Sequence, residues 1–158
     1  MRGPENWYGR DHLWAARLEA AAARHYGDAL TKAVTNTDLT YCNTALDVVG
    51  RDSPARVTVK FLRYGGEWSY GLAPGDFPKV YTAPAPSPHR YPDGSLCLFY
   101  PLDPPWRRWR STDGLDTLFG LVADHLFAED YWHATGATHG GHWILDEAPH
   151  GVTQRSAR

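Results

Sequence analysis

Hydrophobic and polar residues alternate in two central stretches of the chain. Residues 39–49 and 56–64 both follow a period of two, which predicts two strands with one buried face each. The Gly-Arg-Asp-Ser-Pro segment at 50–54 supplies turn residues between them, so we expect an antiparallel hairpin. A shorter third strand is expected at 77–82. Together these stretches predict an antiparallel meander.

Helical spacing appears on either side of these strands. Residues 11–26 predict a helix that has Asp11 as its N-cap and stops at Gly27. A second, longer helix begins near Leu115, where five hydrophobic positions share one stripe: Leu115, Leu118, Phe119, Val122 and Leu126. Its capping candidates are Ser111, Thr112 and Asp113. Helices flanking a meander predict an α+β fold.

Length and composition agree with one globular domain. The chain has 158 residues, of which 42% are hydrophobic and 22% charged, so residues 1–158 are expected to form a single domain with a flexible tail at 153–158. The net charge of −2 argues against non-specific nucleic-acid binding. No run of about 20 apolar residues predicts a membrane span, and the N-terminus lacks a signal-peptide core. We therefore expect a cytoplasmic protein.

The chemistry of the chain points to one of its two cysteines. Residues 83–105 are rich in proline and have no helical period, which is typical of a functional loop. Within it, Cys97 follows a Pro-Asp-Gly turn and lies eight residues after His89. This placement favours an exposed nucleophilic thiol, although a buried structural cysteine is the alternative.

The second cysteine is expected to be structural. Cys42 alternates in phase with Thr44, Leu46 and Val48, which predicts that it is buried with them on one strand face. Both thiols are expected to be free, since a pair of cysteines in an intracellular domain seldom forms a disulfide.

The segment around Cys97 resembles the ubiquitin-conjugating (E2) family. E2 enzymes carry His-Pro-Asn, a turn, then Gly-x-Ile-Cys-Leu with a tryptophan beyond. This chain has Ser-Pro-His at 87–89, Gly-Ser-Leu-Cys-Leu at 94–98, and then Trp106 and Trp109. Phe-Pro-Lys-Val-Tyr at 77–81 is similar to the family's third strand. The resemblance covers residues 11–130 and implies an N-terminal helix, a meander sheet, an active-site loop and a long second helix.

Residues after 134 are similar to one group of E2-like proteins in particular. Thr135-Gly136, Trp143 and the Glu-Ala-Pro-His-Gly segment at 147–151 are similar to the ending of standalone bacterial E2-like proteins of CBASS anti-phage systems. The resemblance implies a protein partner, a cGAS-like cyclic-oligonucleotide synthase (CD-NTase), whose C-terminus is conjugated. Whether a separate activating enzyme is needed stays open.

The same resemblance implies roles for individual residues. Cys97 would form a thioester with the partner's C-terminus and pass the acyl group to an amine. His89 stands where E2 enzymes have asparagine, and would stabilise the oxyanion or assist proton transfer. The acidic residue that E2 enzymes place beyond the cysteine has two candidates here, Asp103 and Asp113. Trp106 and Trp109 would line the site and limit the access of water, or would serve only as packing residues.

Two other functions stay open at this point. One is a non-catalytic E2 variant that only binds its partner, although the presence of Cys97 counts against this alternative. The other is a cysteine hydrolase that uses Cys97 and His89. The chain has no glycine-rich phosphate loop, so neither ATP nor another cofactor is expected. The tail has five potential metal ligands without a metal-binding spacing, and no metal is expected there: His133, His139, His142, His150 and Glu147.

Overall fold

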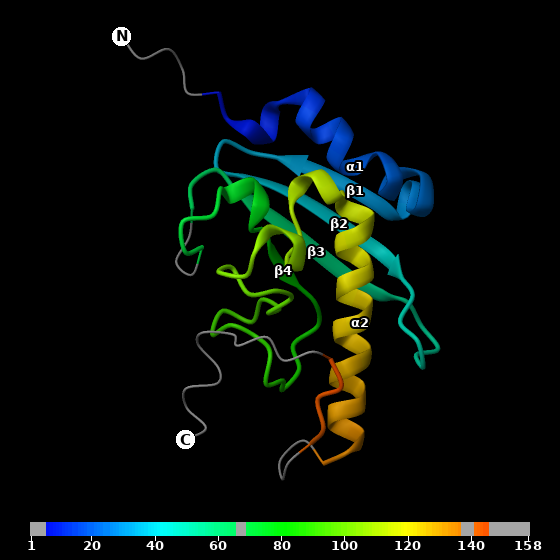
Figure 1. The fold of residues 1–158 in the computed structure, drawn as a ribbon. Coiled ribbons are helices and arrows are strands. Elements are labelled where there is room, and N and C mark those ends of the chain that lie inside the picture. The colour runs from blue at the N-terminus through cyan, green and yellow to red at the C-terminus, as the bar shows by residue number, and fades with distance from the viewer. Residues whose placement is uncertain (1–5, 66–68, 137–140, 146–158) are drawn as a thin grey trace.

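The computed structural model describes residues 6–65, 69–136 and 141–145. Its helices and strands follow in the order α1 (His12–Tyr26), β1 (Leu30–Val34), β2 (Asp38–Leu46), β3 (Ala55–Leu62), β4 (Lys79–Tyr81) and α2 (Leu115–Ala134) (Figure 1). The four strands form one antiparallel sheet in the order β1-β2-β3-β4. The predicted α+β fold, with a helix, a meander, an irregular loop and a long helix, is confirmed.

The ends of α1 are those that the sequence predicts. The Asp11 side chain accepts hydrogen bonds from the backbone N–H groups of Leu13 (3.0 Å) and Trp14 (3.1 Å), which satisfies two donors at the start of the helix. Gly27 ends α1 with φ +52°, a conformation that glycine adopts at little cost.

Strand β1 was not expected from the sequence. Its three central residues, Thr31 to Ala33, are all exposed, so it lacks the alternation that reveals a half-buried strand. It forms because it pairs along β2, from Leu30 opposite Asn43 to Val34 opposite Leu39. Pairing with a neighbour, rather than its own pattern, makes this segment an edge strand.

The prediction that Cys42 is buried together with Leu46 is wrong. The register of β2 against β3 shifts between Asn43 and Leu46, and the Asn43 side chain accepts a hydrogen bond from the Ala45 N–H at 2.9 Å within this bulge. The extra residue reverses the alternation, so Leu46 is buried on the same side as Asn43. Cys42 is on the opposite face and only half-buried, and it is a free thiol.

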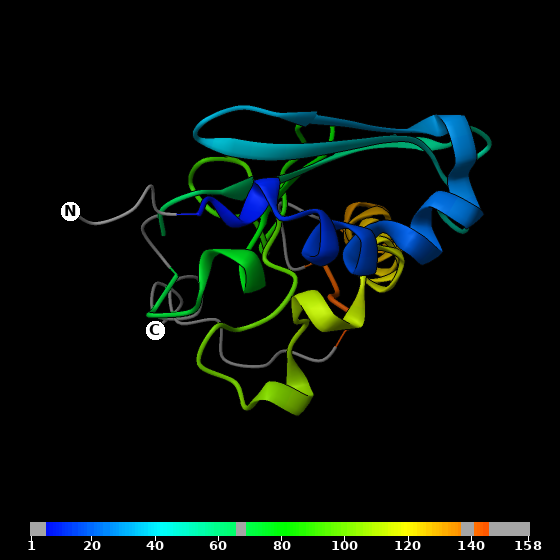
Figure 2. The same cartoon turned by 90° about the horizontal axis from the view of Figure 1, so that it is seen from above.

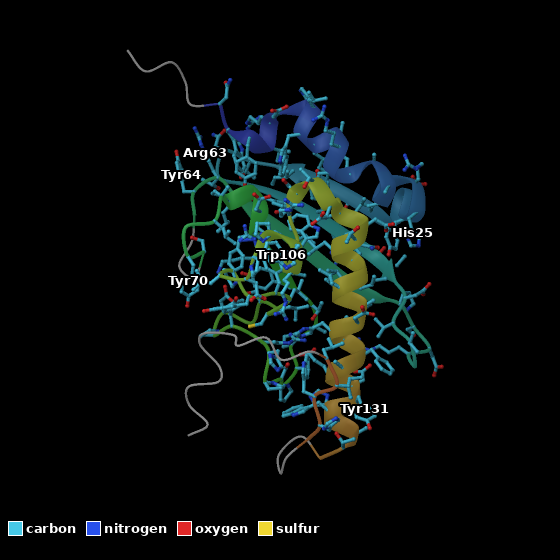
Figure 3. The ribbon with its side chains drawn as sticks, in the orientation of Figure 1. His25, Arg63, Tyr64, Tyr70, Trp106 and Tyr131 are labelled. Atoms are coloured by element: carbon cyan, nitrogen blue, oxygen red, sulfur yellow. The ribbon has the colours of Figure 1, made fainter. Side chains whose placement is uncertain are left out.

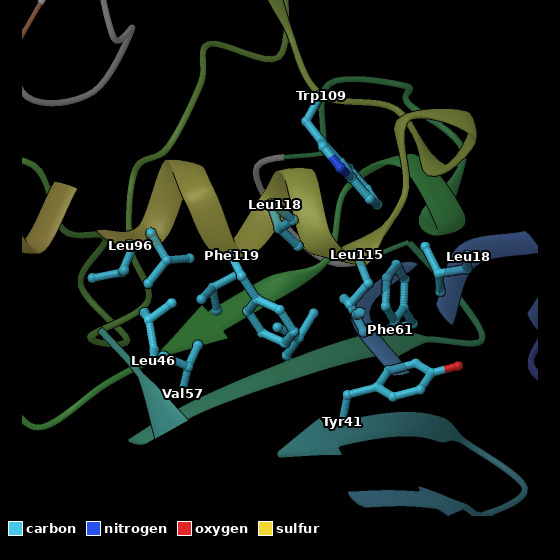
Figure 4. Packing of buried hydrophobic residues seen from close by; sticks show 14 of the residues in the cluster. Leu18, Tyr41, Leu46, Val57, Phe61, Leu96, Trp109, Leu115, Leu118 and Phe119 are labelled. Atoms are coloured by element: carbon cyan, nitrogen blue, oxygen red, sulfur yellow. The ribbon is translucent and has the colours of Figure 1, made fainter. Parts of the chain in front are cut away.

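Both helices and the loop after β4 lie on one side of the sheet (Figure 2). The core forms where the inner sheet face meets α2, whose predicted stripe is fully buried (Figure 4). The sheet contributes Leu39, Tyr41, Val57, Val59 and Phe61, and α2 contributes Leu115, Leu118, Phe119, Val122 and Leu126. No helix in the described ranges is long and apolar enough to cross a bilayer.

The start of α2 differs from the predicted cap. Residues Ser111 to Asp113 form a 3₁₀ turn before the helix, and Gly114, which has no side chain to offer, occupies the N-cap position. Asp113 instead accepts a hydrogen bond from the Arg110 N–H at 2.8 Å and closes that turn. The Gly114 carbonyl accepts a hydrogen bond from the Trp109 indole at 2.9 Å, which ties the loop to the helix.

Candidate active site

The loop after β4 folds back so that Cys97 lies beside His89. The Tyr91 N–H donates to the Ser95 carbonyl at 2.8 Å and the Gly94 N–H to the Tyr91 carbonyl at 2.9 Å, which closes a turn. Gly94 has φ +86°, so glycine suits this position. Beyond the turn, the Cys97 N–H donates to the His89 carbonyl at 2.9 Å. The structure thus brings the two predicted site residues together.

Asp93 holds this turn against the sheet. Its carboxylate accepts hydrogen bonds from the Ser95 N–H (2.9 Å) and hydroxyl (2.5 Å), and forms an ion pair with Lys79 of β4. Burial alone would raise the pKa of Asp93, but the hydrogen bonds from Lys79 and Ser95 outweigh it and lower the pKa to about 2. The turn that presents Cys97 is therefore negatively charged at neutral pH.

The Cys97 thiol is protonated in this structure at neutral pH. The residue is 5% exposed. Burial, and after it the charge of Asp93, raise the pKa of the thiol to about 12, although a hydrogen bond with the Tyr91 side chain acts in the opposite direction. Cys97 is consequently a shielded thiol, not the exposed one that the loop position suggested.

Cys97 and His89 line one cavity of ≈ 260 Å³. Its other walls come from the loop at 98–107, from α2, and from the segment at 141–145 that returns beside α2 (Figure 1). Two carboxylates, Asp103 of the loop and Asp124 of α2, face this space. A cavity with a thiol, two imidazoles and two carboxylates has the groups needed for acyl transfer and proton transfer.

Trp143 closes one side of the cavity by contacting two histidines. Its ring centroid lies 4.3 Å from that of His89 and 5.2 Å from that of His125. Gly141 allows this return of the chain, because a Cβ added there would lie 2.5 Å from the Trp132 carbonyl oxygen. One indole ring therefore contacts both imidazoles.

Neither tryptophan expected at the wall is there. Trp106, which is labelled in Figure 3, is 81% exposed, whereas Trp109 is 2% exposed and belongs to the core. The residue that forms the wall, Trp143, comes from the far end of the chain.

A buried carboxylate, Glu129, anchors the active-site loop to α2. Arg90, the residue after His89, binds both of its oxygens, with Nε to Oε2 at 2.8 Å and Nη2 to Oε1 at 2.7 Å. Burial alone would raise the pKa of Glu129, but the neighbouring Arg90, His125 and Ser87 side chains lower it to about 2. Ser87 also accepts a hydrogen bond from the His89 N–H at 3.1 Å, so Glu129 helps to position the His89 segment.

The structure separates the acidic candidates. Asp103 lines the cavity, whereas Asp113 closes the 3₁₀ turn before α2. Asp124 also lines the cavity and was not expected from the sequence.

The histidines of the tail are only partly described. His133 contacts the Pro86 carbonyl through Nε2 at 2.6 Å, and the backbone N–H of His142 donates to the Thr135 hydroxyl at 2.8 Å. His139, Glu147 and His150 lie outside the described residues, as does the flexible tail expected at 153–158. Among the residues that are described, no group of three or more histidine, cysteine and acidic side chains is placed to hold a metal ion.

His125 and Glu129 escaped the sequence analysis, although a signal for them exists. They continue the buried stripe of α2, four residues apart, after Leu118 and Val122. Polar residues on a buried helix stripe are unusual unless they are paired, so their position alone could have marked them. Trp143 carries no comparable signal, because its partners are distant in sequence.

Comparison with known proteins identifies the family. The sequence model described as Type II CBASS E2 protein matches residues 63–148, more than half of the chain, including His89, Cys97, Glu129 and Trp143. No curated protein matches the chain significantly, and neither does any solved structure. The order of elements around the sheet is also that of the ubiquitin-conjugating fold, as the resemblance implied. The chain therefore belongs to the Type II CBASS E2 protein family.

Proposed function

We propose that this protein is a conjugating enzyme of a CBASS anti-phage system that carries an acyl group on Cys97. An E2-like role in such a system follows from the family. The finer proposal is that Cys97 forms a thioester with the C-terminus of a protein partner and passes it to an amine. The observation that supports it most is the hydrogen bond from the Cys97 N–H to the His89 carbonyl, in a loop whose two side chains share one cavity.

The chemistry has two acyl transfers. In the first, the Cys97 sulfur attacks the activated carbonyl of the partner's C-terminus, and the original leaving group departs with the proton of the thiol. In the second, an amine nitrogen attacks the thioester carbonyl, the C–S bond breaks, and the departing thiolate of Cys97 regains a proton in exchange for the one that the amine loses. Each passes through a tetrahedral oxyanion, which the His89 imidazole stabilises by donating a hydrogen bond.

Tyr91 contributes to the sulfur chemistry. Its side chain hydrogen-bonds with Cys97 and lowers the pKa of the thiol relative to burial alone. The same hydroxyl therefore stabilises the thiolate when it leaves in the second transfer. Burial, and after it the charge of Asp93, have the opposite effect on the pKa and keep the resting thiol protonated.

The partner that we propose is a cyclic-oligonucleotide synthase of the same CBASS system, and it supplies the test. The synthase is prepared with its C-terminus as a small-molecule thioester, which removes any need for a separate activating enzyme, and is mixed with wild type, Cys97→Ala or Cys42→Ala. We expect a thiol-sensitive adduct on non-reducing gels and by mass spectrometry for wild type and Cys42→Ala, and none for Cys97→Ala.

Two results would contradict this function. Absence of any adduct, with synthase binding unaffected by Cys97→Ala, identifies a binding module. Rapid release of the free synthase C-terminus without transfer to an added amine identifies a hydrolase.

A further inference from the structure

A second histidine, His125, shares the cavity with Cys97 and His89. It lies on the buried stripe of α2 and is 2% exposed. Its ring contacts Trp143, which also contacts His89. The fold thus places two imidazoles, from the loop and from α2, at one wall of the cavity that holds the thiol.

His125 has a carboxylate partner one helical turn away. Its Nε2 lies 3.5 Å from Oε2 of Glu129, which is long for a hydrogen bond but close enough for a strong electrostatic contact at a buried site. Glu129 is ionised at neutral pH, since the pKa of its carboxyl is lowered to about 2. Arg90 fixes both carboxylate oxygens, so the carboxylate cannot rotate away from His125. A carboxylate at one ring nitrogen orients the ring and stabilises the imidazolium after proton uptake.

The two acyl transfers need one group that donates a proton to the oxyanion and another that accepts a proton from the amine. The group that stabilises the oxyanion must carry a proton to donate, whereas the group that takes the proton of an attacking amine must have an unprotonated nitrogen with its lone pair free. One imidazole nitrogen cannot serve both functions at the same moment. His89 already neighbours the sulfur, and its place in the loop suits the oxyanion. His125, with its carboxylate, suits the amine.

We propose that His125 is a catalytic base that takes the proton from the acceptor amine, with Glu129 as its positioning residue. This inference rests on the proposed function of Cys97. In the step, the amine nitrogen forms the new C–N bond, the C–S bond to Cys97 breaks, and the amine's proton moves to the His125 imidazole. The imidazolium then returns that proton to the Cys97 thiolate or to solvent.

The test isolates the second transfer. A fluorescent peptide carrying a C-terminal glycine thioester of a small thiol loads Cys97 by thioester exchange, and the loaded protein is then mixed with either free lysine or hydroxylamine. Lysine is almost fully protonated at neutral pH and needs a base, whereas the nitrogen of hydroxylamine is already unprotonated. Both discharge rates are measured on the same loaded sample, so each variant supplies its own reference.

We expect His125→Gln to slow discharge to lysine by about 10² to 10⁴-fold and to leave discharge to hydroxylamine within about threefold of wild type. Glu129→Gln should slow discharge to lysine by a smaller factor. The control is His133→Gln on the same helix, which should change neither rate. Added imidazole should restore discharge to lysine in His125→Ala, which a purely structural role would not allow.

The outcomes distinguish the two proposals. If wild type loads but His125→Gln discharges lysine normally, or loses both rates equally without rescue by imidazole, His125 is not the base, although the thioester function stands. If wild-type Cys97 takes up no acyl group from the peptide or from the synthase thioester, the proposed function fails and the role of His125 fails with it.

Discussion

The surroundings of single side chains decide how this site behaves at rest. Cys97 is held as a thiol by burial and by the charge of Asp93, while Glu129 is held as a carboxylate by Arg90. Burial keeps the thiol neutral and so lowers its reactivity, whereas the groups around Glu129 outweigh burial and keep the carboxylate charged. Each can be tested by one substitution.

The raised pKa of Cys97 predicts slow alkylation. At pH 8 in a Cys42→Ala background, we expect iodoacetamide to react about 10³-fold more slowly than with free cysteine, because a pKa of about 12 leaves that much less thiolate than an ordinary value of about 8.5. The rate should rise about tenfold per pH unit from pH 9 towards 12. Asp93→Asn should increase it at each pH by removing a negative charge. A rate equal to that of free cysteine would contradict the burial.

The ion pair of Glu129 predicts a large loss of stability when its charge is removed. Glu129→Gln leaves the Arg90 guanidinium buried without its partner, and should lower the free energy of unfolding by about 3–5 kcal/mol in urea denaturation. The neighbouring Asp130 pairs with Arg51 at a similar distance, 2.7 Å, but both side chains are about a third exposed. Asp130→Asn should therefore cost only about 0–1 kcal/mol. Equal losses would contradict the role of burial.

The stabilisation that comes from the Glu129–Arg90 ion pair should depend on pH. The pKa of Glu129 falls from 4.5 to about 2 on folding, so its stabilisation is complete above pH 4.5 and is lost as the pH falls towards 2. Wild type should lose on the order of 3 kcal/mol more than Glu129→Gln across that window.

Among the helices and strands, α2 contributes most directly to the site, because Leu121, Asp124 and His125 line the cavity beside the loop residues. One stripe of this helix supplies core residues at its start and His125 and Glu129 further along, and the segment at 141–145 returns beside it. The helix therefore couples the packing of the sheet to the geometry of the cavity. Gly120 within α2 and Gly141 in the returning segment allow a matched comparison.

Two glycine-to-alanine substitutions should have opposite effects. Gly120 is an exposed interior position of α2 where an added Cβ meets nothing within 4 Å, so Gly120→Ala should stabilise the protein by about 0.5–1 kcal/mol. At Gly141 the Cβ would meet the Trp132 carbonyl at 2.5 Å, so the backbone must shift and Trp143 must leave the two histidines. Gly141→Ala should speed alkylation of Cys97 by roughly tenfold, as expected when opening becomes easier by about 1.4 kcal/mol. An unchanged rate would show that Trp143 does not shield the thiol.

For the molecule as a whole, the core ties the active-site loop to both helices. Trp109, at the end of that loop, packs near Phe61 of β3 with ring centroids 6.2 Å apart and donates to the Gly114 carbonyl before α2. Phe61 in turn contacts Trp14 of α1 at 5.4 Å. The loop is thus part of the cooperative unit formed by sheet and helices.

Removing the side chains of the two loop tryptophans should change the free energy of unfolding by very different amounts. Trp109→Ala removes a buried side chain and should lower the free energy of unfolding by about 3–5 kcal/mol, measured by urea denaturation. Trp106→Ala changes a side chain that is 81% exposed and should stay within about 0.5 kcal/mol of wild type. Similar losses for the two variants would mean that Trp106 packs as well.

The sequence by itself predicts what depends on local pattern. The period of β2 and β3, the caps at Asp11 and Gly27 and the stripe of α2 each reflect interactions between neighbours in the chain, and the structure contains them. The spacing of His89 and Cys97 around a tight turn is equally local, so their meeting was also predictable.

Tertiary structure decides what depends on partners distant in sequence. β1 forms only because β2 lies beside it, and the bulge after Asn43 reverses the alternation that made Cys42 look buried. Trp143 reaches His89 across more than fifty residues, and Glu129 meets Arg90 only when α2 packs over the loop. Burial, which sets the reactivity of Cys97, is a property of the folded whole. Residue types and spacing therefore indicate which thiol takes part in the chemistry. The packing of the sheet, α2 and the segment at 141–145 determines which groups surround that thiol.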